Sequence, residues 1–307
     1  MQKKIGVLCS RVRIEEKLIF AALREQKVDY ERVDPRKVTF GLGSGSLGEY
    51  DAVLVRCLSH SRAYYLTRWL DGQGVPTISP HQVVATCGDK MLTSAVLQEA
   101  GVPIPRTVVA FAPQAALEAI EEMGYPVVLK PMHGSWGRLL ARVNDRDAAE
   151  AILEHKTTLG GYAHSSFYIQ EYVNKPGRDI RTMVAGDRVI YAVYQSSDHW
   201  ITNTARGGEP LPCPLTPEIV DLSLKATRAV GGGIVSVDLL ETADGRLLVN
   251  EVNHTPEFHG ARQATDADIA GAMVEYVLQC VQRGTDIETR FLSRCLQKNP
   301  VSEKGER

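Results

Sequence analysis

The sequence predicts an α/β (α+β) fold of three parts: an N-terminal parallel α/β domain, a small central domain and a C-terminal domain of mainly antiparallel sheet. Short apolar stretches alternate with helical patterns at the start of the chain, which is typical of a parallel sheet. These strands are expected at 5–9, 28–33 and 52–56, and the helices at 14–26 and 61–72. Longer strands then follow one another, which indicates antiparallel pairing. They are expected at 167–173, 179–185, 188–195, 234–241 and 246–252, with one helix between them at 216–230.

The central part begins where Gly88-Asp89 opens a predicted helix that runs to Ala100. Asp89 is a favourable N-cap, and Gly101 is a favourable residue to end the helix. The remaining helices are expected at 113–123, 147–154 and 267–283, and the central strands at 126–130 and 138–143. We therefore place the three domains at 1–85, 86–165 and 166–284, followed by a polar tail at 285–307 that we expect to be disordered.

The composition of the 307 residues is that of an ordinary globular protein, with 44% hydrophobic and 23% charged residues. The formal net charge of −2 gives no case for a nucleic-acid partner. No apolar run approaches the roughly 20 residues of a membrane helix, and the first apolar stretch is too short for a secretory signal. Six cysteines without a C-x-x-C pair fit reduced thiols without a catalytic role. We expect a cytoplasmic protein with no membrane contact.

Residues 236–253 read as two apolar strands joined by an Asp-Gly turn. If the turn has two residues, Asp244 and Gly245, then Asp238 lies opposite Glu251 and Ser236 lies opposite Asn253. Residues two apart in a strand point to the same face, so Asn253 joins the two carboxylates. A turn one residue longer would break this register.

Opposed carboxylates on one sheet face need a positive partner, because like charges placed directly across two strands are destabilising. Two carboxylates and an amide oxygen form the all-oxygen set that Mg²⁺ prefers. Asp238, Glu251 and Asn253 therefore predict a site for a hard cation, and a solvated sheet face is the alternative.

Two lysines and a glycine-containing loop that precede residues 236–253 are of the kind that binds phosphate groups. Lys130 closes the strand V-V-L-K, where it could point into a cleft; a surface lysine with a buried stem is the alternative. Lys90 lies in the first turn of its helix, where a bound phosphate would relieve the unfavourable helix dipole. The loop H-G-S-W-G-R at 133–138 offers backbone N–H groups, although a plain turn explains it as well.

Two further segments suit a nucleotide base and an anionic substrate. The strand that ends in Q-E-Y-V at 170–173 leads to Asp179, which suits ribose hydroxyls; an edge strand with a charged turn is the alternative. The segment N-T-A-R-G-G at 203–208 places Asn203 and Arg206 beside two glycines, and Arg206 suits a carboxylate. A solvated loop arginine is the alternative there.

The order of these motifs resembles the ATP-grasp carboxylate–amine ligases across essentially the whole chain. The segments that match the RimK-like branch are D-K at 89–90, V-V-L-K-P at 127–131, Q-E-Y-V at 170–173, D-I-R at 179–181 and E-V-N at 251–253. Three further segments are similar to the LysX group, which joins 2-aminoadipate to the small carrier protein LysW, and to its arginine-pathway counterpart. They are G-S-W-G-R-L-L-A at 134–141, N-T-A-R-G-G at 203–208 and N-E-V-N-H-T-P-E-F at 250–258.

The resemblance implies ATP and Mg²⁺ as cofactors and an ATP-grasp fold whose small central domain acts as a lid. It assigns the ATP phosphates to Lys90, Lys130 and the lid-loop residues Gly134, Ser135, Trp136 and Gly137. It assigns the adenine and ribose to Glu171, Tyr172, Val173 and Asp179, and Mg²⁺ to Asp238, Glu251 and Asn253. It implies catalytic roles for Lys130, Arg181 and Arg206, and amino-acid recognition by Asn203, Arg206, His254 and Thr255.

The implied reaction has two steps. The terminal glutamate carboxylate of a small acidic carrier protein attacks the γ-phosphate of ATP, and the α-amine of 2-aminoadipate or glutamate then displaces the phosphate. The two amino acids differ by one methylene, which a pocket discriminates by only about 1–3 kcal/mol, so the choice stays open. Family members also suggest a homo-oligomer. Candidates for steering the carrier, unless they are simply scattered over the surface, are Arg11, Arg13, Arg56, Arg62 and Arg68.

Three alternatives remain at this stage. The nearest is a RimK-type ligase that adds glutamate to another protein or peptide. A non-catalytic ATP-binding module is a second, although it would not need the complete set of Asp238, Glu251 and Asn253. A zinc site formed by His254 and His259 is a third, but five residues separate them and the H-E-x-x-H pattern is missing.

Overall fold

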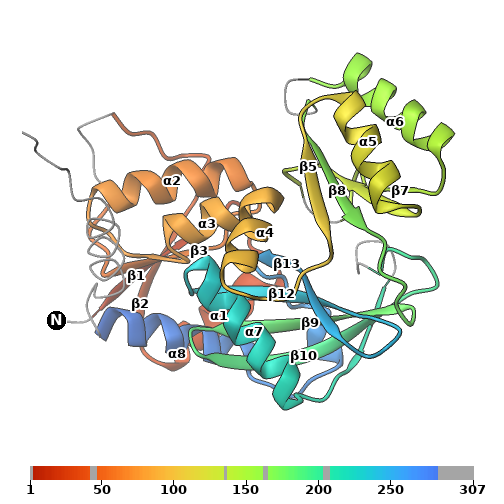
Figure 1. Cartoon of the computed structure of the whole chain (residues 1–307). Coiled ribbons are helices and arrows are strands. Elements are labelled where there is room, and N and C mark those ends of the chain that lie inside the picture. The colour runs from red at the N-terminus through yellow and green to blue at the C-terminus, as the bar shows by residue number, and fades with distance from the viewer. Residues whose placement is uncertain (1–2, 42–46, 135–136, 162–164, 203–207, 283–307) are drawn as a thin grey trace, which may run out of the picture.

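A computed structural model describes residues 3–41, 47–134, 137–161, 165–202 and 208–282, which form three sheets (Figure 1). The first sheet is parallel, with the strand order β2-β1-β3-β4. Its strands are β1 (Lys4–Leu8), β2 (Asp29–Val33), β3 (Ala52–Val55) and the short β4 (Thr77–Ile78), and its helices are α1 (Ile14–Glu25) and α2 (His60–Gly72). This alternation confirms the parallel α/β unit predicted for the start of the chain.

The second sheet is antiparallel, with the order β5-β8-β6-β7. It comprises β5 (Thr107–Ala110), β6 (Val127–Lys130), β7 (Ala141–Val143) and β8 (Phe167–Glu171), and it is covered by α5 (Pro113–Met123) and α6 (Arg146–Leu159) (Figure 1). The strand β8 was expected to open the third sheet, but it pairs with β5 and β6 instead. The exact limits of the three domains remain a prediction.

The third sheet is also antiparallel, with the order β11-β10-β9-β12-β13. Its strands are β9 (Arg178–Ala185), β10 (Arg188–Ser196), β11 (Glu209–Pro212), β12 (Ile234–Glu241) and β13 (Leu247–Asn253). The helix α7 (Pro217–Val230) packs on this sheet, while α8 (Ile269–Gln282) lies between it and the first sheet. A short 3-10 helix, η3 (Ala261–Gln263), follows the loop after β13.

The hydrophobic clusters show which parts are joined. One cluster combines β1 and β3 with α1, α8 and residues of β9, β10 and β12, so the first and third sheets share a core. The second sheet has its own cluster, formed with α5 and α6. Burial of apolar surface is the main stabilising term, so the first and third sheets form one unit and the central sheet a separate one.

Two short helices link the first sheet to the central one. They are α3 (His81–Cys87) and α4 (Lys90–Glu99). Asp89 is the N-cap of α4, because its carboxylate accepts a hydrogen bond of 3.0 Å from the Leu92 N–H, as predicted. Leu97 of α4 belongs to a further hydrophobic cluster, which it forms with α7 and residues of β9, β12 and β13. The helix α4 is therefore part of the larger unit. Within the described residues, no helix is long and apolar enough to cross a bilayer.

Candidate functional site

The β12–β13 hairpin has the predicted pairing but a different turn. Asp238 lies opposite Glu251, and Ser236 lies opposite Asn253. The turn has three residues rather than two, because the Thr242 N–H bonds the Arg246 carbonyl and the Gly245 N–H bonds the Thr242 carbonyl, both at 2.9 Å. A β-bulge beside Asp238 adds one residue, Asn250, to β13 and so restores the register that the longer turn would have shifted.

The bulge supplies the partner of a buried lysine. Lys130 at the end of β6 is buried, and its ammonium group donates a hydrogen bond of 2.8 Å to the Asn250 carboxamide. Burial lowers the pKa of Lys130 to about 8, against the opposing influence of Glu251. Lys130 therefore points into the cleft, as predicted. Asn250 was not among the predicted site residues, although it is the first residue of the segment N-E-V-N-H-T-P-E-F at 250–258.

The positive partner expected beside the opposed carboxylates is an arginine of the neighbouring strand. Arg181 lies opposite Asp238 across β9 and β12, and its Nε and Nη2 donate to the two Asp238 oxygens at 2.6 and 2.7 Å. Burial opposes the charge of Arg181, but the contact with Asp238 outweighs burial and raises its pKa.

The oxygen donors predicted for Mg²⁺ share one wall. Asp238, Glu251 and Asn253 all line the same cavity. Two carboxylates and an amide oxygen suit a hard cation, so these residues fit the metal that the ATP-grasp family uses. In the part of the chain that the structure describes, no group of three or more His, Cys, Asp or Glu side chains is arranged as a metal site.

A cleft of about 100 Å³ between the second and third sheets brings together the candidate nucleotide residues. Glu171, Tyr172 and Val173 line it where the chain leaves β8. The Glu171 carboxylate accepts a hydrogen bond of 2.8 Å from the Arg106 backbone N–H, which fixes this segment against β5. The Tyr172 ring meets the Trp200 ring edge-on, with centroids 6.2 Å apart. Trp200 was not among the predicted residues.

Asp179 lies in the same cleft and already has partners there. Its carboxylate pairs with the Lys175 ammonium group and accepts a hydrogen bond from the Thr202 hydroxyl. Burial raises the pKa of Asp179, against the influence of Lys175. Neither Lys175 nor Thr202 was predicted, since each lies in a segment without a recognisable motif.

Lys90 connects α4 to the glycine loop. Its ammonium group donates a hydrogen bond of 2.8 Å to the Gly134 carbonyl. Gly134 and Gly137 adopt φ angles of 136° and 62°, which favour glycine, and Gly137 lines the nucleotide cleft. Ser135 and Trp136 lie outside the described residues, as do Asn203 and Arg206.

A second cavity, of about 440 Å³, adjoins this cleft and shares three lining residues with it: Arg181, Asp238 and Glu251. His254 and Thr255, predicted to recognise an amino acid, line its wall. The Thr255 hydroxyl lies 2.9 Å from His254 Nδ1. Burial lowers the pKa of His254 to about 4, so the ring is neutral at physiological pH.

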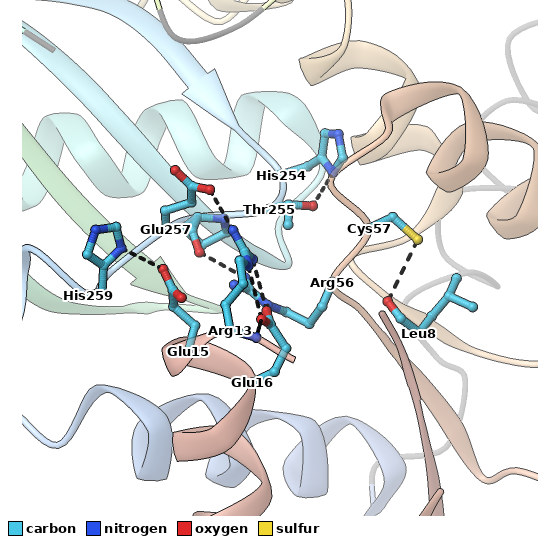
Figure 2. A network of polar contacts seen from close by, with 11 residues as sticks. Leu8, Arg13, Glu15, Glu16, Arg56, Cys57, His254, Thr255, Glu257 and His259 are labelled. Carbon is cyan, nitrogen blue, oxygen red and sulfur yellow. Dashed lines mark hydrogen bonds and ion pairs between the residues drawn. The ribbon is translucent and has the colours of Figure 1, made fainter. Parts of the chain in front are cut away.

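A buried polar network holds this wall against the first sheet (Figure 2). Arg56, at the end of β3, is only 2% exposed. Its Nη1 donates to the Pro256 carbonyl at 2.8 Å, and its Nε pairs with Glu16 at 3.2 Å. Arg13 bridges Glu16 and Glu257. Arg56 is buried, so the prediction that it steers a carrier is wrong, whereas Arg13 keeps some exposure and is paired with two carboxylates.

His259 extends the network and does not join His254. Its Nδ1 lies 2.9 Å from the buried Glu15 carboxylate (Figure 2). His254 instead contacts His60 of α2, with His254 Nε2 3.5 Å from His60 Nδ1. The two histidines of the proposed zinc site thus have different partners. His60 was not predicted, because 194 residues separate it from His254.

Comparison with known proteins agrees with this geometry. The RimK-like ATP-grasp domain matches residues 87–277, and the LysX preATP-grasp domain matches residues 5–86. The chain is 37% identical to the glutamate–LysW ligase ArgX of Sulfurisphaera tokodaii over 276 residues, which cover 89% of this chain and 98% of that protein. It is 30% identical to the α-aminoadipate–LysW ligase LysX of the same organism over 283 residues, covering 91% and 99%.

A solved structure shows the same architecture. The RimK-domain ATP-grasp protein from Sphaerobacter thermophilus superposes with a TM-score of 0.76 at 27% identity, covering 89% of this chain and 98% of that one. The fold and the sequence therefore agree with the matched family over most of the chain. The chain belongs to the RimK-like ATP-grasp family and is an ADP-forming carboxylate–amine ligase.

Proposed function

We propose that this ligase phosphorylates the terminal glutamate carboxylate of a small acidic carrier protein of the LysW type and joins it to the α-amine of a dicarboxylic amino acid. The observation that carries the proposal is the junction of the two cavities. The nucleotide cleft and the second cavity share Arg181, Asp238 and Glu251, so a phosphoryl group in one would face a carboxylate in the other.

The proposed nucleotide roles use the cleft residues and Lys90 beside them. Lys130 lines the cleft and Lys90 contacts the glycine loop, and both would bind the phosphates, while the backbone at Tyr172 and Val173 would face the adenine. Asp179 takes the ribose. Mg²⁺ held by Asp238, Glu251 and Asn253 supplies charge neutralisation for the phosphates when bound.

Catalysis then depends mainly on position and charge. Lys130 and Arg181 are placed to stabilise the charge on the transferred phosphoryl group, because Lys130 is buried beside the cleft and the Arg181 side chain, 16% exposed, lines both cavities. No covalent protein nucleophile is needed. The described cysteines support this, since burial raises the pKa of Cys57 to about 12 and also raises that of Cys87, which suppresses the thiolate.

The second cavity would hold the amino acid, with His254 and Thr255 in its wall and Asn203 and Arg206 as further candidates. We propose glutamate as the preferred amino acid and 2-aminoadipate as the second. The chain has 37% identity to a glutamate–LysW ligase and 30% to an α-aminoadipate–LysW ligase over similar lengths. The expected homo-oligomer and cytoplasmic location remain predictions.

A carrier-dependent ADP-release assay tests the proposal. The reaction contains ATP, Mg²⁺ and an acidic carrier that ends in glutamate, with glutamate and 2-aminoadipate in separate reactions. A matched carrier whose last residue is glutamine is the control, because it keeps the terminal α-carboxylate but lacks the side-chain carboxylate that we propose is phosphorylated. ADP release with the first carrier alone supports the proposal. Equal ADP release with both carriers, or none with either, contradicts it.

A second candidate has specific support. The chain is 39% identical to the tetrahydromethanopterin:α-L-glutamate ligase of Methanococcus maripaludis over 210 residues, which cover 66% of this chain and 70% of that protein. A small-molecule carboxylate would then replace the carrier. An assay with tetrahydromethanopterin in place of the carrier distinguishes the two candidate functions. If the second is correct, ADP is released when the pterin is added and is not released when the carrier is added.

A further inference from the structure

His60 occupies a position where three segments of the chain meet. It is the first residue of α2 and lines the second cavity together with His133, from the loop after β6, and His254, from the loop after β13. Its ring stacks on His133, with centroids 6.4 Å apart and an interplanar angle of 16°. Its Nδ1 lies 3.5 Å from His254 Nε2.

The position of the His60 ring is fixed by its neighbours. A Cβ added to Gly88 would lie 1.8 Å from His60 Cε1, so the ring packs directly on the Gly88 backbone. Any other residue at position 88 would have to displace this imidazole. The Ser59 hydroxyl caps the helix by accepting a hydrogen bond from the Arg62 N–H, which places His60 in the first turn.

A polar chain leads from Thr255 through His254 to His60. The Thr255 hydroxyl bonds His254 Nδ1, and His254 Nε2 faces His60 Nδ1. When the hydroxyl accepts from His254 Nδ1, His254 Nε2 accepts from His60 Nδ1–H. The lone pair of His60 is then on Nε2, for which the described residues show no hydrogen-bond partner.

The proposed reaction needs a group that carries one proton. The free amine bonds to the acyl carbon, the C–O bond to phosphate breaks, and the nitrogen must lose one proton to become an amide. The phosphate departs as a trianion that takes up one proton to become hydrogen phosphate, so a base beside the nitrogen has to accept the proton first. Arg181 and Lys130 are cations and cannot accept it while charged. Asp238 and Glu251 are engaged as proposed metal ligands.

We propose that His60 is the general base of the amide-forming step and takes this proton on Nε2. The inference rests on the proposed function. His254 and Thr255 orient the ring, and Gly88 leaves room for it. His60, which is half-buried and lines the cavity, then returns the proton to the departing phosphate, directly or through solvent.

Charged and titratable groups surround the His60 ring. They are His254, His133, Asp89 at the start of α4 and Tyr64 of its own helix. Burial and His133 lower the pKa of His60, and Asp89 opposes them. The ring is therefore unprotonated at neutral pH, and amide formation should decline as the pH falls through this lowered pKa.

The test separates the two half-reactions. Hydroxylamine is uncharged at neutral pH and traps an acyl phosphate as a hydroxamate without needing a general base. His60→Gln is expected to lower kcat for amide formation by about 100-fold. It should leave carrier-dependent hydroxamate formation and the KM for the amino acid within about twofold, and the acid limb of the kcat–pH profile should disappear.

A matched histidine serves as the control. His81 is the first residue of α3, and its ring also packs on Tyr64, with centroids 4.9 Å apart, but it lines neither the nucleotide cleft nor the second cavity. His81→Gln should therefore keep both rates. If His60→Gln fails to fold, Gly88→Ala displaces the ring while keeping His60 and should show the same selective loss.

Several outcomes would overturn the inference. They are an equal fall of amide and hydroxamate formation in His60→Gln, a rise of the amino-acid KM alone, and a stoichiometric zinc ion that survives dialysis. Failure of the proposed function looks different, because the wild-type enzyme itself would then form no carrier-dependent hydroxamate. Restoration of amide formation in His60→Ala by added imidazole would support the base.

Discussion

The Lys130 ammonium group donates a hydrogen bond of 2.8 Å to Asn250, the residue that the bulge adds to β13. With the observed three-residue turn and no bulge, Asp238 would pair with Asn250 and Glu251 would point to the opposite face. One inserted residue therefore does two things: it supplies an acceptor to a buried lysine and it restores Glu251 beside Asp238.

Asn250→Ala tests the first of these. Removing the acceptor leaves the buried Lys130 without its hydrogen bond, which costs about 1–3 kcal/mol and displaces the ammonium group. We expect the KM for ATP to rise by about tenfold in steady-state assays. Asn144→Ala, at an exposed asparagine after β7, is the control and should change nothing. An unchanged ATP affinity in Asn250→Ala would contradict the role of the bulge.

Loss of the Arg181–Asp238 ion pair should lower both activity and stability. Asp238→Asn leaves the mostly buried Arg181 side chain beside a neutral partner and removes a proposed metal ligand, so ADP release should fall by about 100-fold. The free energy of unfolding, measured with urea, should fall as well, because a buried charge loses its counter-ion.

The same two strands offer a matched control for this variant. Arg178 and Glu241 form an ion pair at 2.9 Å between β9 and β12, at a more exposed position. Glu241→Gln should change stability by no more than about 1 kcal/mol and leave ADP release intact. Equal effects of the two variants would argue against a special role for Asp238.

Breaking the buried network should affect both stability and the second cavity. Arg56→Met leaves Glu16 without one of its two cationic partners and frees the Pro256 carbonyl, which is expected to cost about 3–5 kcal/mol of unfolding free energy. The KM for the amino acid should rise, while the KM for ATP should not. Urea titration and separate substrate titrations measure these changes.

Two further variants make the Arg56 result specific. Arg56→Met combined with Glu16→Gln should recover part of the lost stability, because no unpaired buried carboxylate remains. Arg68→Met removes an arginine that is 62% exposed and pairs with Asp71, and it should be almost neutral. If the double variant were no more stable than Arg56→Met, the ion pair would not be the cause.

The pH dependence of stability follows from Glu15 and Glu16. Burial opposes their charge, but His259 beside Glu15 and Arg13 beside Glu16 outweigh it, and both pKa values lie below the ordinary 4.5. A carboxylate with a lowered pKa in the folded state contributes stability above its unfolded value, and this is lost as the pH falls through the folded value. Urea midpoints should therefore fall steeply below pH 4.5. Glu16→Gln should make the urea midpoint depend less on pH below 4.5. An unchanged dependence in this variant would contradict the role of Glu16.

The sequence was sufficient for the local features and for the order of the site residues. Asp89 caps α4, and Asp238 faces Glu251, because capping and strand alternation depend on neighbouring residues. The turn was predicted one residue too short, and the bulge corrected the register. A bulge depends on what packs against the strand, here Lys130 from another sheet, so it left no local signal.

The features that the sequence did not predict all depend on contacts between residues far apart in the chain. The strand β8 joins the central sheet because β5 and β6 offer it partners, which hydrophobic alternation alone does not reveal. Arg56 was considered as a surface charge, but Glu16 and the Pro256 carbonyl allow it to be buried. His60 lies in an ordinary helix start, and only the fold brings it to His254.

The division of the hydrophobic cores gives Lys90 and Lys130, the two lysines that we propose bind phosphate, a structural role as well. Lys90 belongs to the larger unit and donates a hydrogen bond to the carbonyl of Gly134, in the loop that follows β6 of the central sheet. Lys130 belongs to the central sheet and donates a hydrogen bond to Asn250 of the larger unit. Each lysine is thus a cross-link between the two units, in opposite directions. A phosphate that drew both ammonium groups to itself would replace two direct cross-links by one shared anion. A bound nucleotide would then hold the central unit to the larger one through its phosphates.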